Sequence, residues 1–170
     1  QELKEINSKL EVKVMDRTRE LEQTLDYLKV AQAQLNEEIK TVALVQQNLL
    51  PEGPPDNKEI DAAAVYLASA AVGGDYYDYL DLGNNKLGIV MADVSGHGLP
   101  AAFVMTMVKV LLLHLTEKKM GIKESMETIN ILLSSHIPTH NFVTMVYGEL
   151  DLTAKTFTYI NAGHDQFVLA

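Results

Sequence analysis

The sequence predicts an α+β protein in which a long amino-terminal helix precedes a domain of antiparallel strands and two helices. Three observations predict it: residues 1–50 contain neither glycine nor proline, short runs typical of strands follow residue 58, and two apolar helical segments divide those runs into two groups. With 170 residues, 47% of them hydrophobic, the chain is long enough to bury a core. We therefore expect a coiled-coil helix over 1–50, a linker over 51–57 and a folded domain over 58–170.

Apolar residues in the first segment recur at alternating steps of four and three residues, which is the spacing of a coiled-coil seam. From Val14 to Leu49 the seam has eleven positions, of which eight are apolar and three, Thr18, Gln32 and Gln46, are polar. We expect a homodimer through this helix. Two interpretations stay open: a passive spacer, or a signalling helix that joins an upstream sensor domain of the same polypeptide to the domain that follows. The polar positions favour the second, because they weaken a coiled coil and leave its register adjustable.

The rest of the chain alternates between turn residues and short structured runs. The linker 51–57 contains three prolines and one glycine. We expect, in order, strands over 60–67, 76–82 and 87–94, helices over 99–118 and 122–135, and strands over 142–150 and 156–160. Gly83, Asn84 and Asn85 join the second strand to the third as a hairpin, and Pro100 opens the first of the two helices. This order predicts an antiparallel sheet with helices packed on one face.

Two aspartates stand beside small residues at the open end of the expected first hairpin. Asp75 follows Gly73 and Gly74 just before one strand, and Asp93 lies at the end of the other. Their carboxylates can converge, and two close carboxylates repel one another unless a cation lies between them. Because the chain has no cysteine and no histidine pair on a helix, the oxygen donors favour Mg²⁺ or Mn²⁺ over zinc. The alternative, aspartates that only stabilise turns, stays open; Asp78 is expected to be a solvated strand residue, close enough to act through a bound water.

Other candidate residues lie in glycine-bracketed loops. His97 and His164 are placed there either to meet a substrate or donate a proton, or for structure alone. Ser95 does not fit a nucleophile elbow, because Asp93 occupies the first glycine position of G-x-S-x-G. GHGLPA at 96–101 matches a dinucleotide fingerprint, but an antiparallel hairpin follows in place of a further parallel strand. A formal net charge of -9 without a cluster of Lys or Arg argues against a nucleic-acid partner.

Four motifs, in this order, resemble one phosphatase family. They are VGGDYYD at 72–78, ADVSGHGLPAA at 92–102, FVTMVYGELD at 142–151 and NAGHDQFVL at 161–169. QQNLLP at 46–51 also looks like the usual start of that family's domain. Over residues 46–170 the chain thus resembles the bacterial SpoIIE/RsbU-like branch of the metal-dependent PPM-type serine/threonine phosphatases.

The resemblance implies an α-β-β-α sandwich in which two Mg²⁺ or Mn²⁺ ions activate water for attack on phosphoserine or phosphothreonine. It implies that Asp93 bridges both ions, that the main-chain carbonyl of Val94 binds one of them, and that Asp75 binds an ion or its water. Further candidates, either for contact with the substrate or as parts of the loops around the site, are Asp78, Ser95, Gly96, His97, Asn161 and His164. The family places more metal-binding aspartates beyond the NAGH loop, including an Asp-Gly, so we expect residues 1–170 alone to be weakly active or inactive.

The resemblance also implies partners and a place in the cell. Members commonly dephosphorylate anti-sigma-factor antagonists of the STAS type, and helical linkers often join them to sensor domains. Because the sequence starts at Gln1 with neither a start methionine nor a signal peptide, we expect a piece of a longer protein. The absence of cysteine suits a reducing cytosol, so we expect a cytoplasmic protein or the cytoplasmic part of a membrane-tethered sensor. The alternative is a non-catalytic dimeric switch that binds a phosphorylated regulator through the same cleft.

Overall fold

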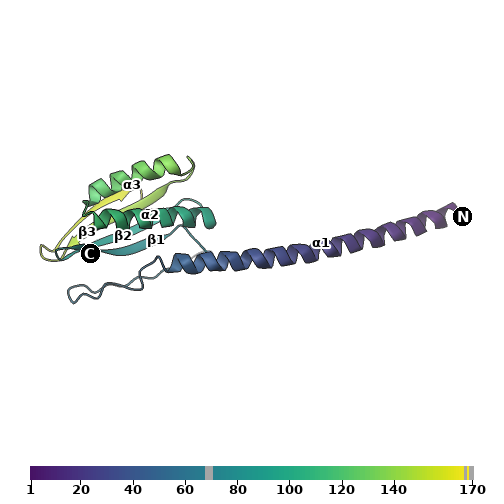
Figure 1. The fold of residues 1–170 in the computed structure, drawn as a ribbon, viewed down its shortest axis with the longest axis horizontal. Helices are drawn as coiled ribbons and strands as arrows, with labels where there is room; N and C mark the ends of the chain where they lie inside the picture. The colour runs from purple at the N-terminus through teal and green to yellow at the C-terminus, as the bar shows by residue number, and fades with distance from the viewer. Residues whose placement is uncertain (68–70, 167, 169–170) are drawn as a thin grey trace. The chain divides into compact units, whose positions relative to one another are not determined.

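The computed structural model describes residues 1–67, 71–166 and 168. Its elements, in chain order, are α1 (Glu2–Gln47), β1 (Tyr76–Gly83), β2 (Lys86–Val94), α2 (Leu99–Glu117), α3 (Ile122–His136), β3 (Val143–Asp151) and β4 (Thr156–Ala162) (Figure 1). The chain divides into two units, Gln1–Thr41 and Val42–Ala170. The expected α+β class is confirmed, and both hairpins and both short helices lie where the sequence predicts them.

The helix α1 runs without interruption over 46 residues. Within the first unit its apolar seam is exposed to solvent, as Leu21 and Leu28 illustrate. The helix ends at Gln47, after which the N–H groups of Leu49 and Leu50 donate to carbonyls three residues earlier, at 3.0 and 3.2 Å, and Pro51 follows. Pairing of this seam with a second copy of the chain stays a prediction.

The prediction that Gln46 belongs to the coiled-coil seam is wrong. Its side chain is only 6% exposed, and it hydrogen bonds to Gly73 inside the unit Val42–Ala170. The four-and-three spacing continues to the end of the helix, but the last turn meets a loop of its own chain. The spacing shows that a side chain is buried, and it does not show which partner buries it.

The strands form a single antiparallel sheet, within the described residues, in the order β1-β2-β3-β4. The first hairpin turns through Gly83, Asn84 and Asn85, whose φ angles of 74°, 52° and 61° are those that glycine and asparagine adopt most readily. In the second, the carboxylate of Asp151 accepts the N–H groups of Thr153 and Ala154, at 3.0 and 2.8 Å. The first turn is therefore fixed by the residues that the sequence predicts for it, and the second is held by the Asp151 side chain, for which no role was predicted.

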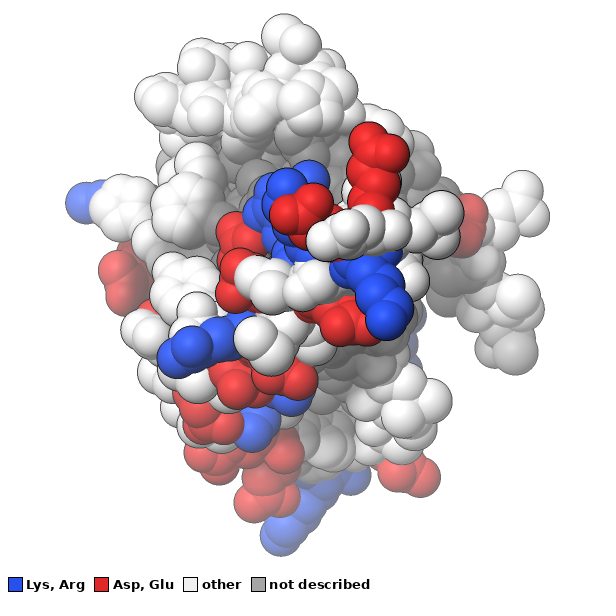
Figure 2. Space-filling model, turned by 90° about the vertical axis from the view of Figure 1, so that its right-hand side faces the viewer, with Lys and Arg blue, Asp and Glu red and all other residues white. Residues whose placement is uncertain are grey.

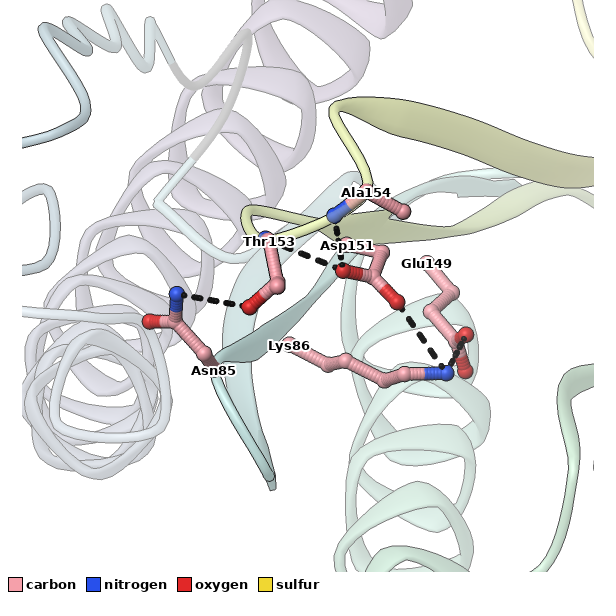
Figure 3. A network of polar contacts seen from close by, with 6 residues as sticks. All are labelled: Asn85, Lys86, Glu149, Asp151, Thr153 and Ala154. Atoms are coloured by element: carbon pink, nitrogen blue, oxygen red, sulfur yellow. Dashed lines mark hydrogen bonds and ion pairs between the residues drawn. The ribbon is translucent and has the colours of Figure 1, made fainter.

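A polar network joins the closed ends of the two hairpins (Figure 3). The Lys86 ammonium lies 2.7 Å from Glu149 and 3.6 Å from Asp151, and Asn85 donates to the Thr153 hydroxyl at 3.2 Å. The Ala154 N–H, and then the charge of Lys86, hold the pKa of Asp151 below its usual value despite an opposing effect of desolvation. These contacts fix the β2–β3 register from the end opposite to the aspartate pair.

The helices cover one face of this sheet, α2 over β1 and β2 and α3 over β3 and β4. Their contact surface is closely packed, with Met105 and Leu112 of α2 fully buried against Val90 and Tyr147 of the sheet. By length and composition alone α2 is apolar enough to cross a membrane. Burial against the sheet accounts for part of that composition, whereas Phe103, Val110 and Leu113 of the same helix are exposed.

The prediction of a strand over 60–67 is wrong. These residues form no helix or strand, and Val65 and Leu67 are exposed. The Tyr66 ring instead lies 6.2 Å from the ring of Tyr77, so the segment passes over the face of β1 and does not pair along its edge. A strand needs a partner for its main-chain groups, and periodicity alone does not supply one.

Charged side chains of both signs are interspersed on the face that Figure 2 shows. Lys and Arg do not form a continuous patch on that face. Several of the charges of α1 are paired along the helix, for example Lys40 with Glu37 at 2.7 Å. Exposed pairs of this kind contribute little to stability.

Candidate functional site

A row of polar residues crosses the open end of the first hairpin. The β1–β2 register pairs Tyr76 with Ala92, and its continuation places Asp75 opposite Asp93. The β2–β3 register then pairs Asp93 with Thr144. Because Ala92 is buried under the helices, Asp93 and Thr144 project from the other face of the sheet. The convergence of the two aspartates, predicted from the hairpin, is what this register produces.

The two carboxyl groups are close enough to influence one another's protonation. Burial raises the pKa of Asp75, and so do the charge of Asp93 and a hydrogen bond with its side chain, whereas His164 acts in the opposite direction. Tyr66 belongs to the same surroundings, since burial and the charge of Asp75 raise the pKa of its hydroxyl. The pair is therefore electrostatically unfavourable with both groups ionised, and a proton or a cation between them relieves the repulsion.

A close main-chain approach adds a third oxygen donor to this corner. A Cβ atom on Gly74 would lie 2.7 Å from the Val94 carbonyl oxygen and 2.9 Å from the Val94 Cβ, so only glycine fits. The loop that carries Asp75 thus runs directly against that carbonyl. Two carboxylates and a carbonyl are the hard oxygen donors that Mg²⁺ and Mn²⁺ prefer. Among the described residues, however, no group of three or more Asp, Glu, His or Cys side chains is placed to hold an ion.

The prediction that Asp78 is solvated is wrong. Its side chain is 3% exposed and faces the helices, where it accepts hydrogen bonds from the Tyr76 hydroxyl at 2.6 Å, from the Tyr79 N–H at 2.9 Å and from the Lys109 ammonium of α2. Asp75 and Asp78 are three residues apart, and side chains at odd separations point to opposite faces of a strand. A role for Asp78 through a water at the aspartate pair is therefore excluded by geometry.

The loop after β2 is anchored across the sheet. The Ser95 N–H donates to the Phe142 carbonyl at 2.9 Å, and the Ser95 hydroxyl accepts the Phe142 N–H at 2.8 Å. Gly96 and Gly98 have φ angles of 93° and 74°, which L side chains rarely adopt. Ser95 therefore holds the loop, and the intervening His97 is exposed to solvent.

The second histidine candidate lies beside the row of polar residues. Asn161 accepts the His164 N–H at 2.8 Å and donates to the His164 carbonyl at 3.1 Å, which closes the loop after β4. The His164 Nδ1 lies 3.0 Å from the Thr144 hydroxyl, and that hydroxyl lies 3.5 Å from the Asp93 carbonyl. Thr144 was not predicted as a site residue, although it lies within the motif at 142–151, and its register with Asp93 is what identifies it.

Asp75 and His164 border a groove on the sheet face away from the helices. The groove has a volume of about 480 Å³ and is lined by Tyr66, Asp75, Tyr77, Met91, His164 and neighbouring residues. It combines an aromatic and apolar wall with a polar end formed by the aspartate.

Comparisons with known proteins agree with the sequence motifs. A model of the family Stage II sporulation protein E (SpoIIE) matches residues 83–170. The phosphoserine phosphatase RsbU of Bacillus subtilis (strain 168) is 30% identical over 138 residues, which cover 81% of this chain and 41% of RsbU. The phosphoserine phosphatase RsbP of the same organism is 28% identical over 131 residues, 75% of this chain and 32% of RsbP. The chain thus spans less than half the length of these relatives.

Solved structures lead to the same fold. The RsbU and RsbW domains of Rv1364c from Mycobacterium tuberculosis align with a TM-score of 0.51 and 33% identity, over 58% of this chain and 27% of that one. The SiaA-PP2C domain of Pseudomonas aeruginosa aligns with a TM-score of 0.60 over 77% of this chain and 55% of that one, but at 17% identity it supports the fold alone. The resemblance read from the sequence is confirmed, and the chain belongs to the SpoIIE family, in the RsbU-like branch of the PPM-type phosphatases.

Proposed function

We propose that this chain forms part of a metal-dependent protein phosphatase that hydrolyses phosphoserine or phosphothreonine at the Asp75–Asp93 pair. The observation that carries the proposal is the arrangement of three oxygen donors, two carboxylates and the Val94 carbonyl, at one end of the sheet beside an open groove. Two relatives named phosphoserine phosphatases support the reaction. PP2C-type phosphatases are generally metal-dependent, which agrees with the donors present.

Each residue of the row has a distinct proposed task. Bound Mg²⁺ or Mn²⁺ ions would supply an acidified water and neutralise charge on the phosphate. Asp93 and Asp75 provide negatively charged oxygens, and Val94 provides a neutral one, so the site favours hard divalent cations. Thr144 and His164 place hydroxyl and imidazole groups beside Asp93, where they can orient the phosphate. Hydrolysis then leaves the free serine or threonine hydroxyl and inorganic phosphate.

The substrate and setting are proposed by analogy with the family. We infer a phosphorylated STAS-type anti-sigma-factor antagonist as substrate and a cytoplasmic protein, dimeric through α1, that carries a sensor domain upstream. The exposed apolar seam of α1 supports the dimer. The alternative, a non-catalytic switch that binds a phosphorylated regulator in the same groove, is favoured by one observation: the described residues hold fewer than three acidic or histidine ligands at the pair.

Phosphate release by the complete protein tests the proposal. Asp93→Asn and Asp75→Asn should each lower the Mn²⁺-dependent rate on a phosphorylated STAS protein at least about 100-fold, because each removes a charged donor. Asp81→Asn is the matched control, since Asp81 is an exposed carboxylate near the far end of β1 that accepts the Gly83 N–H of the turn. If the wild-type protein binds the phosphorylated partner without turnover at any Mn²⁺ concentration, the switch replaces the enzyme.

A further inference from the structure

The last turn of α1 contains a buried glutamine with an unusual partner. Gln46 is almost fully buried, whereas its neighbours Val45 and Gln47 are exposed. The Gln46 Nε2 donates to the Gly73 carbonyl at 2.6 Å, and the Gly73 N–H donates to the Gln46 Oε1 at 3.1 Å. One side-chain amide therefore satisfies both main-chain polar groups of one residue, as a neighbouring strand would.

This pairing matters because the loop of Gly73 lies outside any strand. Its main-chain groups have no ladder partner, and a partly buried N–H or carbonyl left unpaired is costly. Only glutamine combines the required donor and acceptor at this reach. Glutamate keeps the acceptor but sets a charged oxygen against the Gly73 carbonyl, leucine has neither group, and asparagine is shorter by one methylene.

The loop so held is the one that carries Asp75. Gly74 lies against the Val94 carbonyl and the Ala101 side chain. A Cβ atom added to Gly74 would be 3.2 Å from the Ala101 Cβ. The Asp75 carbonyl has one further contact, a long one, with the Tyr66 hydroxyl at 3.5 Å. The two hydrogen bonds between Gln46 and Gly73 are shorter than the contact of Tyr66 with the Asp75 carbonyl. They hold the main chain two residues before the Asp75 carboxylate.

We propose that Gln46 is a positioning residue for Asp75: by pairing with Gly73 it fixes the carboxylate opposite Asp93, so that the last turn of α1 sets the affinity of the site for its cation. This inference rests on the proposed function, because its consequence is measured as cation binding. It assigns to Gln46 a task different from packing, since the bonds are made to a loop and not to the core between helices and sheet.

The test compares isosteric and apolar replacements in the complete protein. Gln46→Glu and Gln46→Leu should bind Mn²⁺, titrated without substrate by electron paramagnetic resonance, about tenfold more weakly than wild type. The Gly73 amide should exchange with solvent faster, and hydrolysis should recover at high Mn²⁺ with an unchanged KM for the phosphorylated protein. Gln47→Glu and Gln47→Leu, one residue along on the exposed side of the same turn, should behave like wild type in every measurement.

The outcomes separate this inference from the proposed function. Gln46 variants that melt at a lower temperature but bind Mn²⁺ as tightly as wild type would show a purely structural role and overturn the inference. Weaker Mn²⁺ binding by these variants in a protein that releases no phosphate would support the inference while the phosphatase proposal fails. A wild-type protein that binds no Mn²⁺ would overturn both.

Discussion

Replacing Lys109 with methionine should destabilise the domain strongly, because it leaves the buried Asp78 carboxylate without its cation. Asp78 is 3% exposed and the Lys109 side chain 13% exposed, so water cannot replace the lost ammonium. Breaking a buried ion pair on one side typically costs about 3 to 5 kcal/mol in the free energy of unfolding. We expect the lower end, about 3 kcal/mol, because the Tyr76 hydroxyl and the Tyr79 N–H still donate to the carboxylate.

Urea denaturation followed by circular dichroism measures this cost, and a fall of about 10 °C in the melting temperature should accompany it. Lys123→Met is the matched control, since that side chain is 81% exposed on α3. Combining Lys109→Met with Asp78→Asn removes both charges while an acceptor remains for the two donors, and it should cost less than Lys109→Met alone. A cost below about 1 kcal/mol for Lys109→Met, or a double variant as unstable as the sum of the singles, would refute the reasoning.

Three further predictions concern the site, the hairpin ends and the helix. Gly74→Ala should weaken Mn²⁺ binding and lower stability, because its Cβ has no room, whereas Gly53→Ala, with open space around it, should change neither; equal effects would contradict the close approach. Asp151 has a lowered pKa through its bond from the Ala154 N–H, so it stabilises the fold above the pKa of the unfolded state and this contribution disappears as the pH falls through the lower folded value. Asp151→Asn should therefore flatten the acid side of the stability profile measured by urea titration; an unchanged profile counts against it. Gln32→Leu should tighten dimerisation of the complete protein in analytical ultracentrifugation, and an unaltered dissociation constant would argue against a seam at that position.

The local parts of the fold follow from the sequence because their causes are local. Gly83, Asn84 and Asn85 specify the first hairpin through their tolerance of positive φ, and the hairpin in turn places Asp75 opposite Asp93. The alignment also depends on a register shift between Asp81 and Gly83, which the turn residues alone do not predict. Nothing distant in the sequence is needed to predict the hairpin itself.

The parts that the sequence did not predict depend on partners elsewhere in the chain. The run at 60–67 has strand-like composition but passes over the face of β1, and Thr144 meets Asp93 only through a register set by residues about fifty positions away. Strand parity places Asp78 on the face opposite to its neighbours Tyr77 and Tyr79. Parity does not show which of the two faces is buried, because that depends on where α2 packs. In each case the local sequence predicts an extended segment or the side of a strand on which a residue lies. Contacts with distant parts of the chain decide what that segment or side chain packs against.

Asp78 of β1 and Asp75, just before β1, are expected to affect different properties, stability and cation binding. The two proposals can therefore be distinguished by experiment. Asp78 points into the core and pairs with Lys109, so changes there should lower the melting temperature and leave the cation affinity of the folded protein unaltered. Asp75 lies in the loop before the strand and is tied to α1 through Gln46, so changes along that path should alter cation affinity out of proportion to stability. A plot of Mn²⁺ affinity against melting temperature for both sets of variants should therefore give two separate groups. A single line through all of them would mean that the site responds only to global stability, and α1 would then have no specific route to it.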